Sequence, residues 1–176
     1  MREAARETGA PLALAESAFV RMVSCIRLIQ GRLHEHEPAR STMAQDVTKL
    51  PPTFYVARAH AAREGDDREA AREAFERALA LGLLEMPRGP PWTTTMTWAA
   101  DISAWLDDRS TAIRLLELLT PLAGVMTWAY GPIGRGVGLL ELTLGRRGQA
   151  ERRLRDAIAL CERMDARAFL AMARLD

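Results

Sequence analysis

Apolar residues recur along this chain at the three- and four-residue spacing of amphipathic helices. No segment shows the strict alternation typical of a β-strand, and proline and glycine separate the helical stretches. The pattern predicts an all-α fold without a sheet. It predicts a disordered or frayed N-terminus over residues 1–10 and a single domain over 11–176, with helical hairpins at about 11–47, 53–81, 91–122 and 133–164 and a partial ninth helix over 166–176.

Three of the predicted hairpins carry the same short pattern, a tight turn followed by apolar positions at intervals of four and three. The copies are Gly65-Asp66 with Ala71, Phe75 and Ala78; Asp107-Asp108 with Ala112, Leu116 and Leu119; and Gly145-Arg146 with Ala150, Leu154 and Ala157. The first small residue recurs from 71 to 112 and from 112 to 150, after 41 and then 38 residues. Such a period indicates stacked units that bury their apolar sides on one another. In the first copy, Asp66 is expected to cap the second helix.

This pattern resembles tetratricopeptide repeats, in which a small residue and a Gly-Asp-like turn precede Ala, Phe and Ala. Residues 53–81 match best, through Ala59, Gly65-Asp66, Ala71, Phe75 and Ala78. The closing proline of the standard repeat is absent, and the loops between repeats are longer. The resemblance implies a right-handed solenoid of antiparallel helix pairs whose first helices line a concave groove.

A second resemblance spans about residues 10–176. The stretches 30–38, 86–92, 117–124 and 139–146 are similar to the C-terminal helical-repeat region of large bacterial signalling ATPases. Those proteins often carry an adenylate/guanylate-cyclase-like domain or a LuxR-type DNA-binding domain. The resemblance implies a sensing or scaffolding arm of a bacterial signalling or transcriptional regulator. It leaves open whether the chain is a fragment or acts alone, and which oligomer it forms.

Charge and hydropathy narrow the range of partners. Lysine and arginine number 24 against 23 acidic residues, for a net charge of +1, so no broad field draws the chain to nucleic acid or anionic lipid. No apolar run approaches the ~20 residues of a membrane span, and residues 1–7 lack a signal-peptide core. We therefore expect a cytoplasmic protein. Cys25 and Cys161 lie in apolar helical runs and are expected to be buried thiols, with a disulfide left open.

No group of residues makes a case for catalysis. His34 and His36 are two apart, which points them to different sides of a helix, and the HExxH spacing is absent. The glycine-rich stretch 131–138 has no strand before it and no Gly-Lys-Ser/Thr after it, so close helix packing is favoured over phosphate binding. For Trp92, Trp98, Trp105 and Trp128, core filling is favoured over an aromatic recognition platform. We expect no enzyme, metal or cofactor.

The tetratricopeptide resemblance implies ligand contacts on the first helix of each pair. Carried onto this chain, these positions are His60, Arg63, Thr97, Asp101, Trp105, Arg135 and Leu139. The arginines suit bidentate binding of a carboxylate, and the alternative is that they form only a solvated surface. The favoured interpretation is a non-catalytic module that binds a protein or peptide segment, or a domain of a parent regulator, in its groove. A small-molecule inducer sensor is the alternative, and an enzyme is the least favoured.

Overall fold

The computed structural model describes residues 22–23, 25–27, 29–30, 32, 50–127 and 129–176. This part of the chain is mostly helical, as the sequence predicts. The helices are α4 (Pro52–Glu64), α5 (Arg68–Ala80), α6 (Pro90–Leu106), α7 (Arg109–Leu119), α8 (Ile133–Thr143), α9 (Arg147–Arg163) and α10 (Arg167–Leu175), with short 3-10 turns η3 (Leu83–Glu85) and η4 (Thr120–Leu122). The predicted N-terminus over 1–10 and most of the 11–47 hairpin lie outside the described residues.

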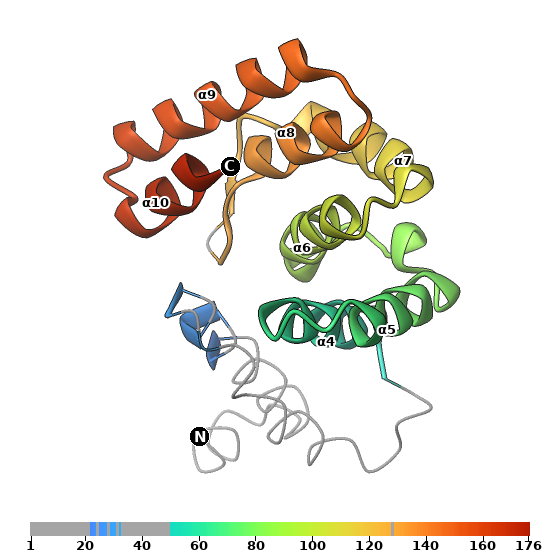
Figure 1. Ribbon diagram of the computed structural model, residues 1–176. Coiled ribbons are helices and arrows are strands. Elements are labelled where there is room, and N and C mark those ends of the chain that lie inside the picture. The colour runs from blue at the N-terminus through green and yellow to red at the C-terminus, as the bar shows by residue number, and fades with distance from the viewer. Residues whose placement is uncertain (1–21, 24, 28, 31, 33–49, 128) are drawn as a thin grey trace.

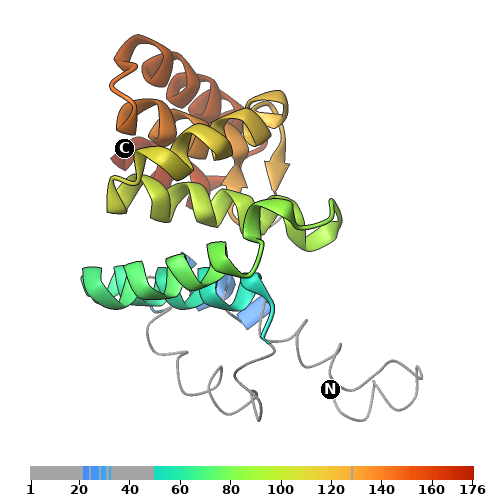
Figure 2. The ribbon, with the colours of Figure 1, turned by 90° about the vertical axis from the view of Figure 1, so that its right-hand side faces the viewer.

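Helices that follow one another in sequence also lie together in space (Figures 1 and 2). α4 packs on α5, α6 on α7, α8 on α9, and α10 on α9. α4 also contacts α6, and α6 contacts α8. The first helices of the three pairs are therefore neighbours. The right-handed solenoid built from these pairs stays a prediction.

Four tight turns between helices share one backbone geometry. Each has a left-handed residue, and the residue after it donates its amide to a carbonyl five positions back, as in a Schellman motif. The left-handed residues are Asp66, Asp107, Gly145 and Asp165, and the donors are Asp67, Asp108, Arg146 and Ala166, at 2.8–2.9 Å. Asp67 caps α5 by accepting from the Ala70 amide at 3.0 Å. The predicted cap, Asp66, is wrong by one residue, because Asp66 itself occupies the left-handed position.

The prediction that the chain has no strand is wrong at one place. β1 (Met126–Thr127) and β2 (Gly131–Pro132) form an antiparallel ribbon in the connector between α7 and α8. The Thr127 hydroxyl donates to the Gly131 carbonyl at 2.9 Å and accepts from the Tyr130 amide at 3.1 Å. Strands of two residues are too short to show an alternating pattern. The ribbon holds the Tyr130 side chain in the core.

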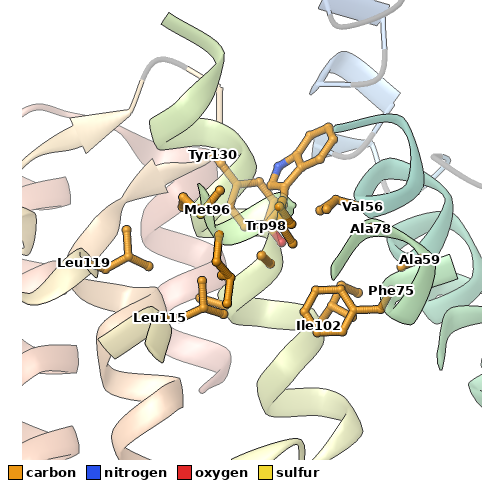
Figure 3. Close-up of a cluster of buried hydrophobic side chains, with 14 of the residues drawn as sticks. Val56, Ala59, Phe75, Ala78, Met96, Trp98, Ile102, Leu115, Leu119 and Tyr130 are labelled. Atoms are coloured by element: carbon orange, nitrogen blue, oxygen red, sulfur yellow. The ribbon is translucent and has the colours of Figure 1, made fainter. Parts of the chain in front are cut away.

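The hydrophobic core is centred on α6, which lies between α4 and α8 (Figure 3). It contains Val56, Phe75, Met96, Ile102, Leu115, Leu119 and Tyr130. The core-filling prediction is confirmed for Trp92 and Trp98, and Trp128 lies outside the described residues. Cys25 and Cys161 are both buried, and the disulfide between them that the sequence left open is not formed.

The glycines of α8 allow close packing on several sides, as predicted. A Cβ on Gly134 would lie 2.7 Å from the Ala123 carbonyl oxygen, and one on Gly138 would lie 2.8 Å from Leu154 Cγ. Either distance is too short for a side chain. The glycine-rich stretch therefore serves helix packing. Among the described helices, none combines the length and the apolar character needed to cross a bilayer.

Candidate functional site

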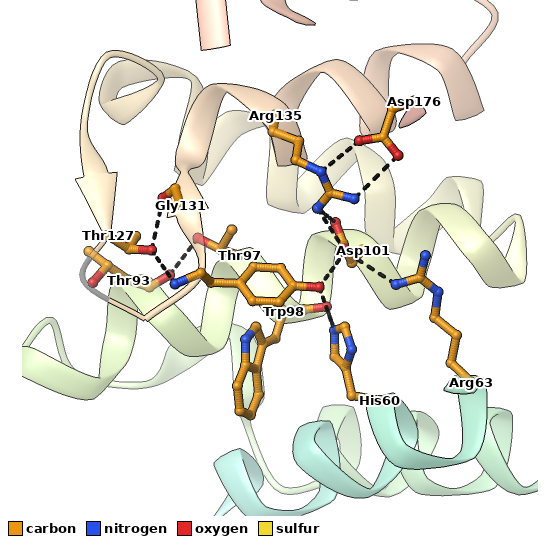
Figure 4. Close-up of polar contacts among 11 residues, drawn as sticks. His60, Arg63, Thr93, Thr97, Trp98, Asp101, Thr127, Gly131, Arg135 and Asp176 are labelled. Atoms are coloured by element: carbon orange, nitrogen blue, oxygen red, sulfur yellow. Dashed lines mark hydrogen bonds and ion pairs between the residues drawn. The ribbon is translucent and has the colours of Figure 1, made fainter. Parts of the chain in front are cut away.

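Four charged side chains alternate in sign from α4 to the end of α10. They are Arg63 on α4, Asp101 on α6, Arg135 on α8 and Asp176 directly after α10, and we call them the charge ladder (Figure 4). Successive members are 38, 34 and 41 residues apart. These intervals are close to the repeat period in the sequence. The charge ladder therefore joins the successive first helices α4, α6 and α8, at positions that shift by about one helical turn from each helix to the next.

Arg135 occupies the centre of the charge ladder and binds two carboxylates. Its Nη1 atom lies 2.9 Å from both carboxylate oxygens of Asp101. Its other edge forms a bidentate pair with Asp176, with Nε–Oδ2 at 2.6 Å and Nη2–Oδ1 at 3.3 Å. The side chains are 6% exposed for Arg135, 0% for Asp101 and 16% for Asp176. Charges this deeply buried are stable only when they are paired.

Asp101 receives two further donors. The Tyr130 hydroxyl lies 2.5 Å from Oδ2, and Arg63 Nη1 lies 3.3 Å from the same oxygen. Burial alone would raise the pKa of Asp101, but the charges of Arg135 and Arg63 outweigh it and hold that pKa below its ordinary value. Burial and the nearby Asp101 charge raise the pKa of Tyr130 well above its ordinary value. At neutral pH the carboxylate is therefore ionised and the phenol is a proton donor.

His60 lies beside the charge ladder as a neutral ring. Burial lowers the pKa of His60 to about 3. Its Nε2 atom lies 3.2 Å from the Trp98 carbonyl oxygen, which can only accept, so Nε2 carries the proton. The imidazole also packs against the Trp98 and Tyr130 rings, each with centroids 5.4 Å away. His60 therefore joins α4 to α6 and to the ribbon.

The seven predicted ligand-contact residues do not share one environment. Four are buried and bonded within the protein: His60, Thr97, Asp101 and Arg135. Thr97 donates to the Thr93 carbonyl at 2.7 Å. The bonds of His60, Asp101 and Arg135 join neighbouring helices, whereas the Thr97 bond lies within α6, and their burial contrasts with a solvated surface. A ligand contact by these four stays a prediction. Arg63 is 31% exposed, and Trp105 and Leu139 are half-buried, so a ligand contact by these three stays a prediction.

Sequence reasoning missed Tyr130 and Asp176, which bind Asp101 and Arg135 of the charge ladder. Tyr130 lies in a connector, where helical spacing gives no information about burial. Asp176 lies 41 residues after Arg135, so the repeat interval itself was a signal that pointed to it.

One side of α6 carries two buried polar atoms that have no hydrogen-bond partner among the described residues. They are Thr94 Oγ1 and Trp98 Nε1, on residues four apart and therefore on one side of the helix. The neighbouring Thr95 differs, because its hydroxyl donates to the Pro91 carbonyl at 2.7 Å. A buried polar group left unpaired costs about 1–3 kcal/mol. The two unpaired groups therefore lower the stability of the fold.

A cavity of about 250 Å³ lies away from the charge ladder, between α9 and the start of α8. Its lining includes Arg153, Asp156 and Arg163 of α9, together with Ala123 and Gly134. Two guanidinium groups and one carboxylate give it a mildly basic character. Within the described part of the chain, no cluster of histidine, cysteine or acidic residues could hold a metal ion, and His34 and His36 lie outside that part.

Comparison with known proteins gives no relative: no protein-family model, curated protein or solved structure matches the chain.

Proposed function

We propose that this protein is a non-catalytic interaction module. In this proposal α4 to α10 form a right-handed, tetratricopeptide-like solenoid, and the face made by α4, α6 and α8 binds a protein segment or a partner domain. The module would act in the cytoplasm as a sensing or scaffolding arm of a bacterial signalling or transcriptional regulator. The charge ladder is the observation that supports it best, because it links the first helices of successive hairpins at intervals of 34 to 41 residues, close to the hairpin period of 38 and 41 residues.

The chemistry of the buried cluster favours binding over catalysis. Asp101 is saturated by Arg135, Arg63 and Tyr130, so it is not placed to remove a proton from a substrate. His60 is neutral and donates to a main-chain carbonyl. What the cluster supplies is rigidity, since it fixes neighbouring helices relative to one another. A rigid face loses less conformational entropy when a ligand binds.

Peptide selection from a random dodecapeptide library, with the folded full chain as bait, tests this proposal. We expect enriched peptides whose affinity falls in Trp105→Ala and Leu139→Ala, because both side chains are half-buried on the proposed face. Ile113→Ala is the matched control, since Ile113 is an exposed apolar residue on α7. Circular dichroism confirms that each variant is folded. Peptides that bind all three variants equally well would exclude this face.

A small-molecule sensor is the second candidate, and the cavity beside α9 is the observation that favours it. Its volume of about 250 Å³ is just below the range of about 300–1,000 Å³ for ordinary ligand sites. A small anionic metabolite is the best fit to its two arginines. In a thermal-shift screen such a ligand would raise the melting temperature by mass action, and Arg153→Ala would remove the shift. A screen without any shift would reject this candidate.

A further inference from the structure

We infer that the cavity between α9 and the start of α8 binds an α-amino dicarboxylic acid of about the size of glutamate. This inference rests on the second candidate function, the small-molecule sensor, because it names the class of molecule that the same cavity takes. Three observations carry it: the order of charges along the cavity wall, the absence of partners for these charges among the described residues, and the space above Gly124.

Three charged side chains of α9 line the cavity in the order positive, negative, positive. They are Arg153, Asp156 and Arg163, and Leu160 lies between the last two. Steps of three, four and three residues keep all four on one side of the helix. An α-helix rises about 1.5 Å per residue, so Asp156 lies about 5 Å along the axis from Arg153, and Arg163 lies about 10 Å further on. The wall therefore has a cationic group at each end, with an anionic group near one of them.

The charged side chains of this wall are not used by the fold. Among the described residues, none of the three makes an ion pair or a side-chain hydrogen bond. Both glutamates of α9 differ, because each pairs with an arginine. The pairs are Glu151 with Arg155 and Glu162 with Arg174. Asp156 has arginines three and four positions before it, at spacings that suit helical ion pairs, and within the described part of the chain it binds neither. The wall therefore keeps its hydrogen-bonding capacity for a molecule in the cavity.

A dicarboxylic amino acid carries its charges in the complementary order. Its α-carboxylate and α-ammonium groups are neighbours, as Arg153 and Asp156 are, and its second carboxylate is at the far end, as Arg163 is. A guanidinium binds a carboxylate through two parallel hydrogen bonds, and an ammonium group donates to the Asp156 carboxylate. Two arginines and one aspartate have a net charge of +1, which balances the net charge of about −1 of such an amino acid at neutral pH. A dicarboxylate that lacks the ammonium group would instead meet Asp156 as a like charge.

The size of the cavity and the access to it also fit a molecule of this class. The cavity volume is about 250 Å³, which corresponds to about eight liquid waters or to one molecule of about ten non-hydrogen atoms. Gly124 lines the cavity, and a Cβ at this position would meet no atom of a described residue within 4 Å. The backbone of Gly124 is not left-handed, so a side chain can be added there without strain. This position therefore provides a way to fill the cavity.

Isothermal titration calorimetry on the full chain compares L-glutamate with two analogues that each lack one group. Glutarate lacks the ammonium group, and L-glutamine lacks the second carboxylate. We expect L-glutamate to bind at least about tenfold more tightly than either analogue, because each analogue leaves one charged partner unpaired. Asp156→Asn should remove the preference over glutarate, and Arg163→Gln should remove the preference over L-glutamine. Arg152→Gln, at an exposed arginine of α9 that does not line the cavity, is the matched control and should behave as the wild type.

A second pair of variants tests the place of binding. Gly124→Leu should abolish L-glutamate binding, because the added side chain fills the cavity. Gly148→Leu is the matched control, since Gly148 is an exposed glycine of α9 that does not line the cavity. Circular dichroism confirms that each variant is folded. L-glutamate binding that survives Gly124→Leu would overturn the inference.

The outcomes separate this inference from the sensor candidate. Glutarate that binds as tightly as L-glutamate and depends on Arg153 would overturn the inference and leave that candidate standing. So would a thermal shift that depends on Arg153 and comes from another class of molecule, together with no heat of binding for L-glutamate. A screen without any shift would overturn both. If Gly124→Leu does not fold, the comparison of L-glutamate with glutarate in the wild type and in Asp156→Asn still decides the question, because Asp156 is exposed.

Discussion

Replacement of Asp101 by asparagine is the most direct perturbation of the charge ladder. The side chain keeps its size and one acceptor oxygen but loses its charge. Arg135 then remains buried at 6% exposure, and Asp176 is its single counter-charge within the part of the chain that the structure describes. Arg63 and Tyr130 each lose the carboxylate oxygen to which they donate.

The expected cost is large for one substitution. Removing one partner of a buried ion pair costs about 3–5 kcal/mol. Asp176 still neutralises Arg135, so we expect the lower end, about 3 kcal/mol for Asp101→Asn. A domain of this kind is stable by about 5–15 kcal/mol, so the variant should still fold.

Urea denaturation followed by circular dichroism at 25 °C measures this difference. Glu151→Gln is the control, because Glu151 pairs with Arg155 on the surface, where the side chains are 61% and 73% exposed. Its expected cost is below about 0.5 kcal/mol. A loss of less than about 1 kcal/mol for Asp101→Asn, with an unchanged urea dependence, would refute the argument that the buried charges stabilise this fold.

Three further outcomes follow from the structure. The pKa of His60 is about 3 in the folded state and about 6.5 in the unfolded state, so the unfolded state binds protons first as the pH falls. The free energy of unfolding should therefore drop by about 2 kcal/mol from pH 7.5 to pH 5. Urea titrations of His60→Gln should lack this drop, and a pH dependence identical to that of the wild type would contradict the prediction. Thr94→Val should raise the melting temperature, because it removes a buried hydroxyl that has no hydrogen-bond partner among the described residues. Thr95→Val should lower the melting temperature, because the Thr95 hydroxyl is bonded, and equal shifts in the two variants would show that the Thr94 hydroxyl has a partner. Gly138→Ala should lower the free energy of unfolding by about 1–3 kcal/mol, because the added methyl group would overpack against α9. Gly148 lies in α9 with no atom closer than 3.9 Å to an added Cβ, so Gly148→Ala should be neutral or stabilising by up to about 1 kcal/mol. The opposite order of stability in urea denaturation would contradict the packing argument.

Helices α5, α7, α8, α9 and α10 were predictable because each carries an amphipathic pattern with clear breaks. In α4 and α6 that pattern is weak, and proline at the start and a tight turn at the end marked their limits. The start of α6 at Pro90 differs from the expected start by one residue, which is the usual uncertainty of a helix end. The ribbon at β1 and β2 was not predictable, because two residues are too few to show a period. The cap at Asp67 was missed because the sequence does not show which member of the Asp66-Asp67 pair becomes left-handed.

The sequence predicted where the candidate site residues lie better than it predicted what they do. Repeat spacing, together with the tetratricopeptide resemblance, placed Arg63, Asp101 and Arg135 on first helices, and the structure brings these three together. The same spacing does not tell whether a charged residue faces a ligand or a neighbouring helix. That distinction depends on burial by elements far apart in sequence, such as Tyr130 from the connector and Asp176 from the end of α10.

The double pairing of Arg135 affects how the helices come apart. In a simple array each hairpin contacts only its neighbours, and the last helix can unravel at little cost to the rest. Here the detachment of α10 would withdraw Asp176 and leave Asp101 to neutralise both Arg135 and Arg63. Fraying of the final helix is therefore penalised through a series of paired charges that extends back to α4, and we expect α4 to α10 to melt as one cooperative unit.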